Sequence, residues 1–129
     1  MGARELLAQG PGAPALGRRV SDGPLVEAVL PQLAARIEAA LRAQGEPRLA
    51  DQVATLRITA VCPCDQPFCG SFHTLRRPFM RWFIRGRQIE VHDDGPGEVV
   101  VDVVRGEIAY VEVLDLDDVR AALDGLDSA

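Results

Sequence analysis

The segment Cys62-Pro63-Cys64-Asp65-Gln66-Pro67-Phe68-Cys69-Gly70-Ser71-Phe72-His73 holds all three cysteines of the chain and one of its two histidines. Residues 53–61, which precede it, are rich in β-branched side chains and alternate with a period of two, which predicts a strand that runs into Cys62. Residues 65–68 predict a reverse turn, and residues 69–75 predict a returning strand. In this hairpin Cys64 lies opposite Cys69, and Cys62 lies one pleat away on the same side. We therefore expect the three sulfur atoms to converge.

Three convergent thiolates suit a soft, tetrahedral cation such as zinc, with one ligand still to be supplied. His73 is the candidate for that ligand if the chain bends at Gly70, because four residues of extended strand span roughly 13 Å. His92, Asp65, a water or no ligand at all are the alternatives. The segment predicts a zinc site built from Cys62, Cys64, Cys69 and His73.

Two other interpretations of the cysteines stay open. Reduced cysteines pack as small hydrophobic side chains, and Cys64 and Cys69 are neighbours in the predicted hairpin, as a disulfide or redox pair requires. An odd number of cysteines, with no secretory signal, argues against a disulfide framework and favours a reducing compartment. We accordingly expect a cytoplasmic protein.

The first part of the chain predicts an arm followed by a helix. Residues 1–24 contain glycine and proline pairs that break regular structure, so we expect a flexible or loosely docked arm before a single domain at 25–129. Residues 25–44 predict an amphipathic helix, because their apolar side chains recur at spacings of three and four. Pro31 either kinks this helix or marks its start, and Gly45 ends it.

The last third predicts strands and a short helix. Residues 88–91 predict a strand. Residues 98–104 and 107–114 predict a hairpin that is closed by Arg105-Gly106. With a two-residue turn, one face of the hairpin holds Val99, Val101, Val103, Ile108 and Tyr110, and the other holds Val100, Val104, Ala109, Val111 and Val113. A last helix is expected at 119–123, ended by Gly125. The fold class is thus α+β, an N-terminal amphipathic helix packed on a mainly antiparallel sheet of about five strands with a short C-terminal helix.

A second unusual segment, residues 76–87, carries five of the 14 arginines and the only tryptophan. As a strand it turns Met80, Trp82 and Ile84 toward the core. Arginine and aromatic residues are enriched at protein–protein hot spots, and the outer side still leaves two phenylalanines to be covered. We therefore expect a surface for a protein partner or for self-association, made of Arg77, Phe79, Arg81, Phe83 and Arg85. The alternative is an ordinary strand.

Charge is divided unevenly along the chain. Residues 1–87 hold 12 arginines and seven acidic residues, whereas residues 88–129 hold two arginines and 12 acidic residues, which together give the net charge of −5. This division favours packing of the acidic part against the basic part, within one chain or head to tail between two chains. It argues against nucleic-acid binding, and no apolar run is long enough to cross a membrane.

Two patterns carry a resemblance to known proteins. The hairpin at Val99–Leu114 resembles the terminal hairpin of small bacterial domains of unknown function. The C-x-C…F-C pattern at Cys62–Cys69 is similar to that of short uncharacterised proteins of actinobacterial type. The resemblance implies an α+β single domain without assigned catalytic residues.

These features favour a small binding or regulatory module, such as a neutraliser or accessory protein, with a structural cysteine-based metal site. A metal-trafficking or redox protein is the first alternative, and a metal-dependent hydrolase is the second. The sequence contains no glycine-rich phosphate loop and no nucleophile elbow, and it offers no clear pair of buried carboxylates. It therefore favours a non-enzymatic role and leaves catalysis open.

Overall fold

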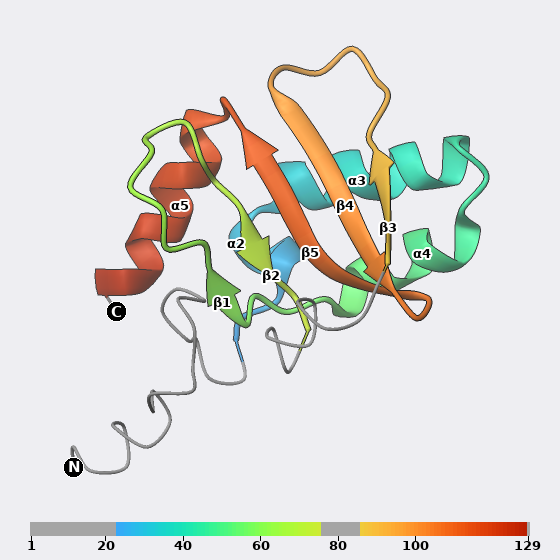
Figure 1. Cartoon of the computed structure of the whole chain (residues 1–129), viewed down its shortest axis with the longest axis horizontal. Helices are drawn as coiled ribbons and strands as arrows, with labels where there is room; N and C mark the ends of the chain where they lie inside the picture. The colour runs from blue at the N-terminus through green and yellow to red at the C-terminus, as the bar shows by residue number, and fades with distance from the viewer. Residues whose placement is uncertain (1–22, 76–85, 129) are drawn as a thin grey trace, which may run out of the picture.

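The computed structural model describes residues 23–75 and 86–128 (Figure 1). The described strands form one five-stranded sheet in the order β1-β2-β5-β4-β3, and every neighbouring pair is antiparallel. These strands are β1 (Ala60–Val61), β2 (Phe72–His73), β3 (Arg87–Glu90), β4 (Glu98–Val104) and β5 (Glu107–Leu114). The helices are α2 (Val26–Val29), α3 (Pro31–Ala43), α4 (Pro47–Gln52) and α5 (Asp117–Ser128). The predicted α+β class is therefore confirmed, with its antiparallel sheet and C-terminal helix.

Helices α3 and α4 lie along one face of the sheet, and α5 lies beside the loop that joins β1 to β2 (Figure 1). The buried side chains of α3 belong to one hydrophobic cluster that also includes Phe72 of β2 and Val101 of β4. Leu123 of α5 is fully buried in the same cluster. Within residues 23–75 and 86–128, no helix combines the length and the apolar character needed to cross a membrane.

The helix predicted over residues 25–44 is divided into α2 and α3. Leu30 lies between them with φ −129° and ψ 64°, and Pro31 is the first residue of α3. Proline has no N–H to donate and disfavours helical geometry in the residue before it, so it begins a new helix here. At the other end Gly45, with φ +83°, allows Glu46 N to donate to Leu41 O at 2.8 Å in a Schellman motif.

The strand predicted over residues 53–61 is wrong in its first half. Pro47 begins the helix α4, and Val53–Thr55 follows as a turn of 3-10 helix, so only Ala60–Val61 is strand. The short helix prevails because proline suits a first helical position, whereas β-branched residues are only weakly specific for strands. The predicted alternation still holds beyond it, since Leu56, Ile58 and Ala60 are buried.

The central hairpin has the predicted bounds but not the predicted faces. Arg105 and Gly106 both have positive φ, as a two-residue hairpin turn requires. Val103 pairs with Ile108, but Asp102 pairs with Tyr110, so Ala109 is an extra residue in β5. A one-residue bulge moves every later side chain to the other face. As a correction, Val111 and Val113 share the core face with Val99, Val101, Val103 and Ile108, whereas Tyr110 lies on the opposite face.

Two smaller predictions also need correction. The strand expected at 88–91 is Arg87–Glu90, and the last helix is Asp117–Ser128, longer than the expected 119–123. Gly125 lies inside α5 and does not end it, because a glycine costs a helix only about 1 kcal/mol. Asp117 and Asp118 stand in the first turn, where negative charge stabilises the helix dipole.

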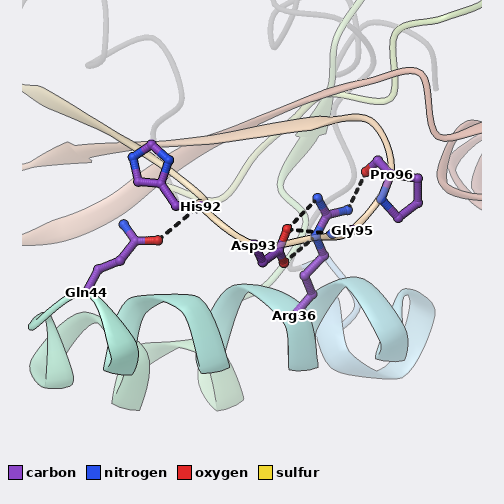
Figure 2. A network of polar contacts seen from close by, with 6 residues as sticks. All are labelled: Arg36, Gln44, His92, Asp93, Gly95 and Pro96. Atoms are coloured by element: carbon purple, nitrogen blue, oxygen red, sulfur yellow. Dashed lines mark hydrogen bonds and ion pairs between the residues drawn. The ribbon is translucent and has the colours of Figure 1, made fainter.

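Two side chains, Arg36 in α3 and Gln44 directly after it, fasten this helix to β3 and the β3–β4 loop (Figure 2). Arg36 donates to both carboxylate oxygens of Asp93, at 2.9 and 3.1 Å, and to Pro96 O at 2.7 Å. Gln44 donates to Glu90 O at 2.9 Å and accepts from His92 N at 2.8 Å. The hydrogen bonds from Arg36 are the largest cause of a lowered pKa of Asp93. The contact between Arg36 and the β3–β4 loop therefore depends on the ionised form of Asp93.

Candidate metal centre

The cysteine loop, residues 62–70, begins directly after β1. Ala60 pairs with His73 and Val61 with Phe72, and Cys62 N donates to Ser71 O at 3.0 Å. If the same register continued, Cys64 would pair with Cys69, which is the pairing predicted for a four-residue turn at 65–68. The chain instead leaves the ladder after Cys62, and Cys69 forms a bridge with Leu114 of β5.

The three sulfur atoms nevertheless converge. The Sγ atoms of Cys62, Cys64 and Cys69 all lie within 4.8 Å of one another. Thiolates bound tetrahedrally to zinc, with Zn–S of about 2.3 Å, lie about 3.8 Å apart. A contraction of about 1 Å at most would therefore bring the sulfurs to ligating distance. Cys69 is buried at 8% exposure, whereas Cys62 and Cys64 are half-buried.

Backbone hydrogen bonds hold the loop against the end of β5. Cys69 N donates to Gln66 O at 3.0 Å and closes the turn. Gly70 N donates to Val113 O, and Asp115 N donates to Phe68 O, each at 2.8 Å. The end of the central hairpin therefore holds the loop on either side of Cys69, so the position of this cysteine depends on the tertiary fold.

Arg120 of α5 joins the C-terminal helix to the same loop. Its Nη1 donates to Gln66 O at 2.6 Å and to Cys69 O at 2.9 Å, and its Nε donates to Asp124 at 3.1 Å. A Cβ on Gly70 would lie 3.0 Å from the Val119 side chain, so glycine allows this close approach. No sequence pattern singles out Arg120, because a tertiary contact between a helix and a loop far away in the chain leaves no local signal.

Hydrogen bonds lower the pKa of the Cys69 thiol. Burial alone would raise the pKa of its thiol, but hydrogen bonds from the Ser71 hydroxyl and backbone N–H, together with those from the thiols of Cys64 and Cys62, outweigh burial and lower it. The protonated Cys69 thiol donates to Ser71 Oγ at 3.5 Å, and Ser71 Oγ also accepts from Val113 N at 3.0 Å and donates to Val113 O at 3.5 Å. When Cys69 is a thiolate, the Ser71 hydroxyl can turn its proton to the sulfur instead.

The pKa of the Cys64 thiol is shifted in the opposite direction. Burial raises the pKa of its thiol to about 11, the Gln66 N–H opposes this, and the thiols of Cys69 and Cys62 raise it further. The protonated Cys64 thereby donates to the neighbouring thiolate. Metal ligation requires deprotonated cysteines, so a cation that binds here would replace the proton that Cys64 shares with its neighbour.

The two histidines lie outside the sulfur cluster. Among residues 23–75 and 86–128, the only group of potential metal ligands within reach of one ion is the three cysteines. His73 is 3% exposed in β2, where its ring packs against that of Tyr110 with centroids 4.6 Å apart. His92 is exposed in the β3–β4 loop. The bend at Gly70 that would carry His73 to the cysteines is not present, since Gly70 hydrogen-bonds to β5 instead.

The predicted partner surface, Arg77, Phe79, Arg81, Phe83 and Arg85, lies outside the described residues. One feature that sequence reasoning did not single out is Phe68 at the tip of the cysteine loop. Its side chain is 45% exposed and is the one large hydrophobic side chain classed as exposed in the part of the chain that the structure describes. It stands four residues from Cys64.

The site thus offers three soft donors on a short loop fixed by a strand and a helix. Such a donor set suits zinc and other thiophilic cations. No protein-family model matches the chain, and comparisons with curated proteins and with solved structures also found no match.

Proposed function

We propose that this protein is a small metal-binding module in which Cys62, Cys64 and Cys69 hold one thiophilic divalent ion, zinc by preference. The convergence of the three sulfurs within 4.8 Å is the observation that carries the proposal. The cysteine loop contacts β5 through backbone hydrogen bonds and α5 through Arg120. An ion in the loop would therefore stabilise the junction between sheet and C-terminal helix, which is a structural role.

Metal analysis of protein purified without a chelator tests this directly. We expect about one zinc per chain in the wild type, and a loss of that zinc in Cys64→Ser, because two thiolates alone bind zinc far more weakly. His92→Ala is the matched control, since it removes an exposed ligand-type side chain outside the cluster. Equal zinc content in wild type and Cys64→Ser would contradict the proposal.

A metal-trafficking or redox role is the second candidate, and the partial exposure of Cys62 and Cys64 favours it. The two roles differ in what happens when the ion leaves. If removal by a chelator unfolds the chain, the ion is structural; if the fold survives and the ion exchanges readily with a competing chelator, the thiolates serve transfer. Circular dichroism before and after chelation separates the two. A hydrolase would need a metal-bound water.

The binding role also rests on the arginine and aromatic residues at 77–85. Their composition is typical of protein contact surfaces, and it supports a protein partner or self-association. We expect Arg81→Glu combined with Arg85→Glu to change the assembly state or the proteins captured from an extract. If the double variant leaves both unchanged, this part of the proposal is wrong. A reducing, cytoplasmic location fits free thiols at the site.

A further inference from the structure

The sulfur cluster has no fourth protein donor within the described part of the chain. All three cysteines and both histidines of the sequence lie in residues 23–75 and 86–128. Neither histidine belongs to the cluster, and no described carboxylate joins it. Zinc sites with four protein ligands are closed, whereas sites with three protein ligands keep a fourth position for water or for an incoming molecule.

The open position faces solvent. Cys69 is the buried member of the cluster, next to Ser71 and the β5 backbone, while Cys62 and Cys64 are half-buried. The tip of the loop, residues 65–68, is exposed throughout. A ligand that approaches from solvent therefore meets the side of the cluster on which Cys62 and Cys64 lie.

Charge decides which kind of ligand this position favours. Three thiolates around a divalent ion leave one net negative charge. Asp65 follows Cys64 directly in the chain, and Asp115 is hydrogen-bonded to the loop through its N–H at Phe68 O. Arg120, the cation that contacts the loop, is also paired with Asp124. An anionic fourth ligand would raise the net charge of the site to −2 on a loop that also carries Asp65, and a neutral ligand would not.

We propose that the ion at this site carries one exchangeable neutral ligand, a water that a neutral nitrogen donor such as imidazole can replace. This inference rests on the proposed metal site. In the exchange the water leaves as a neutral molecule, the nitrogen lone pair takes its position on the ion, and neither the charge nor the oxidation state changes. The module would then recognise molecules or side chains that present such a nitrogen.

Cobalt(II) in place of zinc gives a test with a spectroscopic readout. Thiolate-to-cobalt charge-transfer bands report the three sulfurs, and the visible d–d bands report the fourth ligand. We expect imidazole to shift the d–d bands of the loaded wild-type protein in a saturable way. Azide, an anionic probe, should bind roughly tenfold more weakly or worse, since a repulsion of about 1.4 kcal/mol corresponds to a factor of ten.

Asp65→Asn tests the charge argument without touching a ligand. It should strengthen azide binding and leave imidazole binding unchanged, whereas Asp94→Asn, in the distant β3–β4 loop, should alter neither. Absence of charge-transfer bands in the wild type would overturn the metal site itself. Charge-transfer bands with d–d bands that ignore both probes, or azide binding tighter than imidazole binding, would overturn this inference alone.

Discussion

Arg120 connects the C-terminal helix to the cysteine loop through side-chain hydrogen bonds. Its guanidinium donates to the carbonyl oxygens of Gln66, in the exposed tip of the loop, and of Cys69, directly after that tip. These two bonds fix the backbone between Cys64 and Cys69, and the positive charge offsets part of the negative charge of a thiolate cluster. Arg120 is thus a positioning residue for the proposed ion and does not contact it through a donor atom.

Arg120→Ala should therefore weaken metal binding. We expect cobalt(II) affinity to fall about tenfold, because hydrogen bonds to charged groups contribute about 1.5–3 kcal/mol and solvent recovers part of that at a half-exposed site. Arg120→Lys should restore part of the affinity, and Arg42→Ala removes an exposed arginine elsewhere as a control. Lower stability with unchanged cobalt affinity would show that Arg120 acts on the helix alone.

The ion pair between Arg36 and Asp93 makes a separate prediction, on pH. The pKa of Asp93 is lowered, above all by the hydrogen bonds from Arg36. Ionised Asp93 therefore adds to the free energy of unfolding at pH values above the ordinary carboxyl pKa of about 3.9. This contribution is lost as the pH falls through the lowered pKa of the folded state.

Asp93→Asn should accordingly reduce the free energy of unfolding at neutral pH and have little effect at about pH 2. Chemical denaturation at several pH values measures the difference, with Asp94→Asn as a control of equal charge in the same loop. A difference from wild type that does not change with pH would refute the role of the ionised pair.

Among the elements, the β4–β5 hairpin shows which features can be predicted from sequence and which cannot. Its bounds follow from local chemistry, because two valine-rich runs flank an Arg-Gly pair suited to a positive-φ turn. The bulge at Ala109 has no such local signal, since it depends on how β5 fits β2 and β4 together. The cysteines converge as predicted, but Cys69 reaches the cluster through a bridge to Leu114 of β5 and not through the predicted pairing with Cys64. The positions of His73 and Arg120 likewise depend on tertiary contacts.

Two glycines in different elements give opposite predictions for the same substitution. Gly106 has φ +78° in the hairpin turn, and Gly125 lies in α5; a Cβ at either would meet nothing within 4 Å. Gly106→Ala should destabilise the protein by about 1 kcal/mol, because a side chain strains the left-handed backbone. Gly125→Ala should stabilise it by about 0.5–1 kcal/mol through helix propensity. Thermal unfolding of both variants measures these changes, and equal signs would contradict the backbone assignment.

At the scale of the whole molecule, the cysteine loop lies where three parts of the fold meet. It follows β1, pairs with the end of β5 and is bound by α5, whose Leu123 is buried in the same core as α3. An ion in this loop would therefore be coupled to global folding. Binding to the native state alone raises stability by an amount that depends only on the ratio of free ion to dissociation constant.

Zinc should thus stabilise the wild type by about 2.7 kcal/mol when free zinc exceeds the dissociation constant a hundredfold. The increase should follow the logarithm of zinc concentration and disappear on chelation, and Cys64→Ser should show none of it. His92→Ala, with the cluster intact, should respond as the wild type does. Denaturant midpoints at a series of buffered zinc concentrations measure the slope. A zinc response that survives in Cys64→Ser would place the ion elsewhere in the chain, whereas a wild type that binds zinc with no change in midpoint would mean that the loop is not coupled to the core.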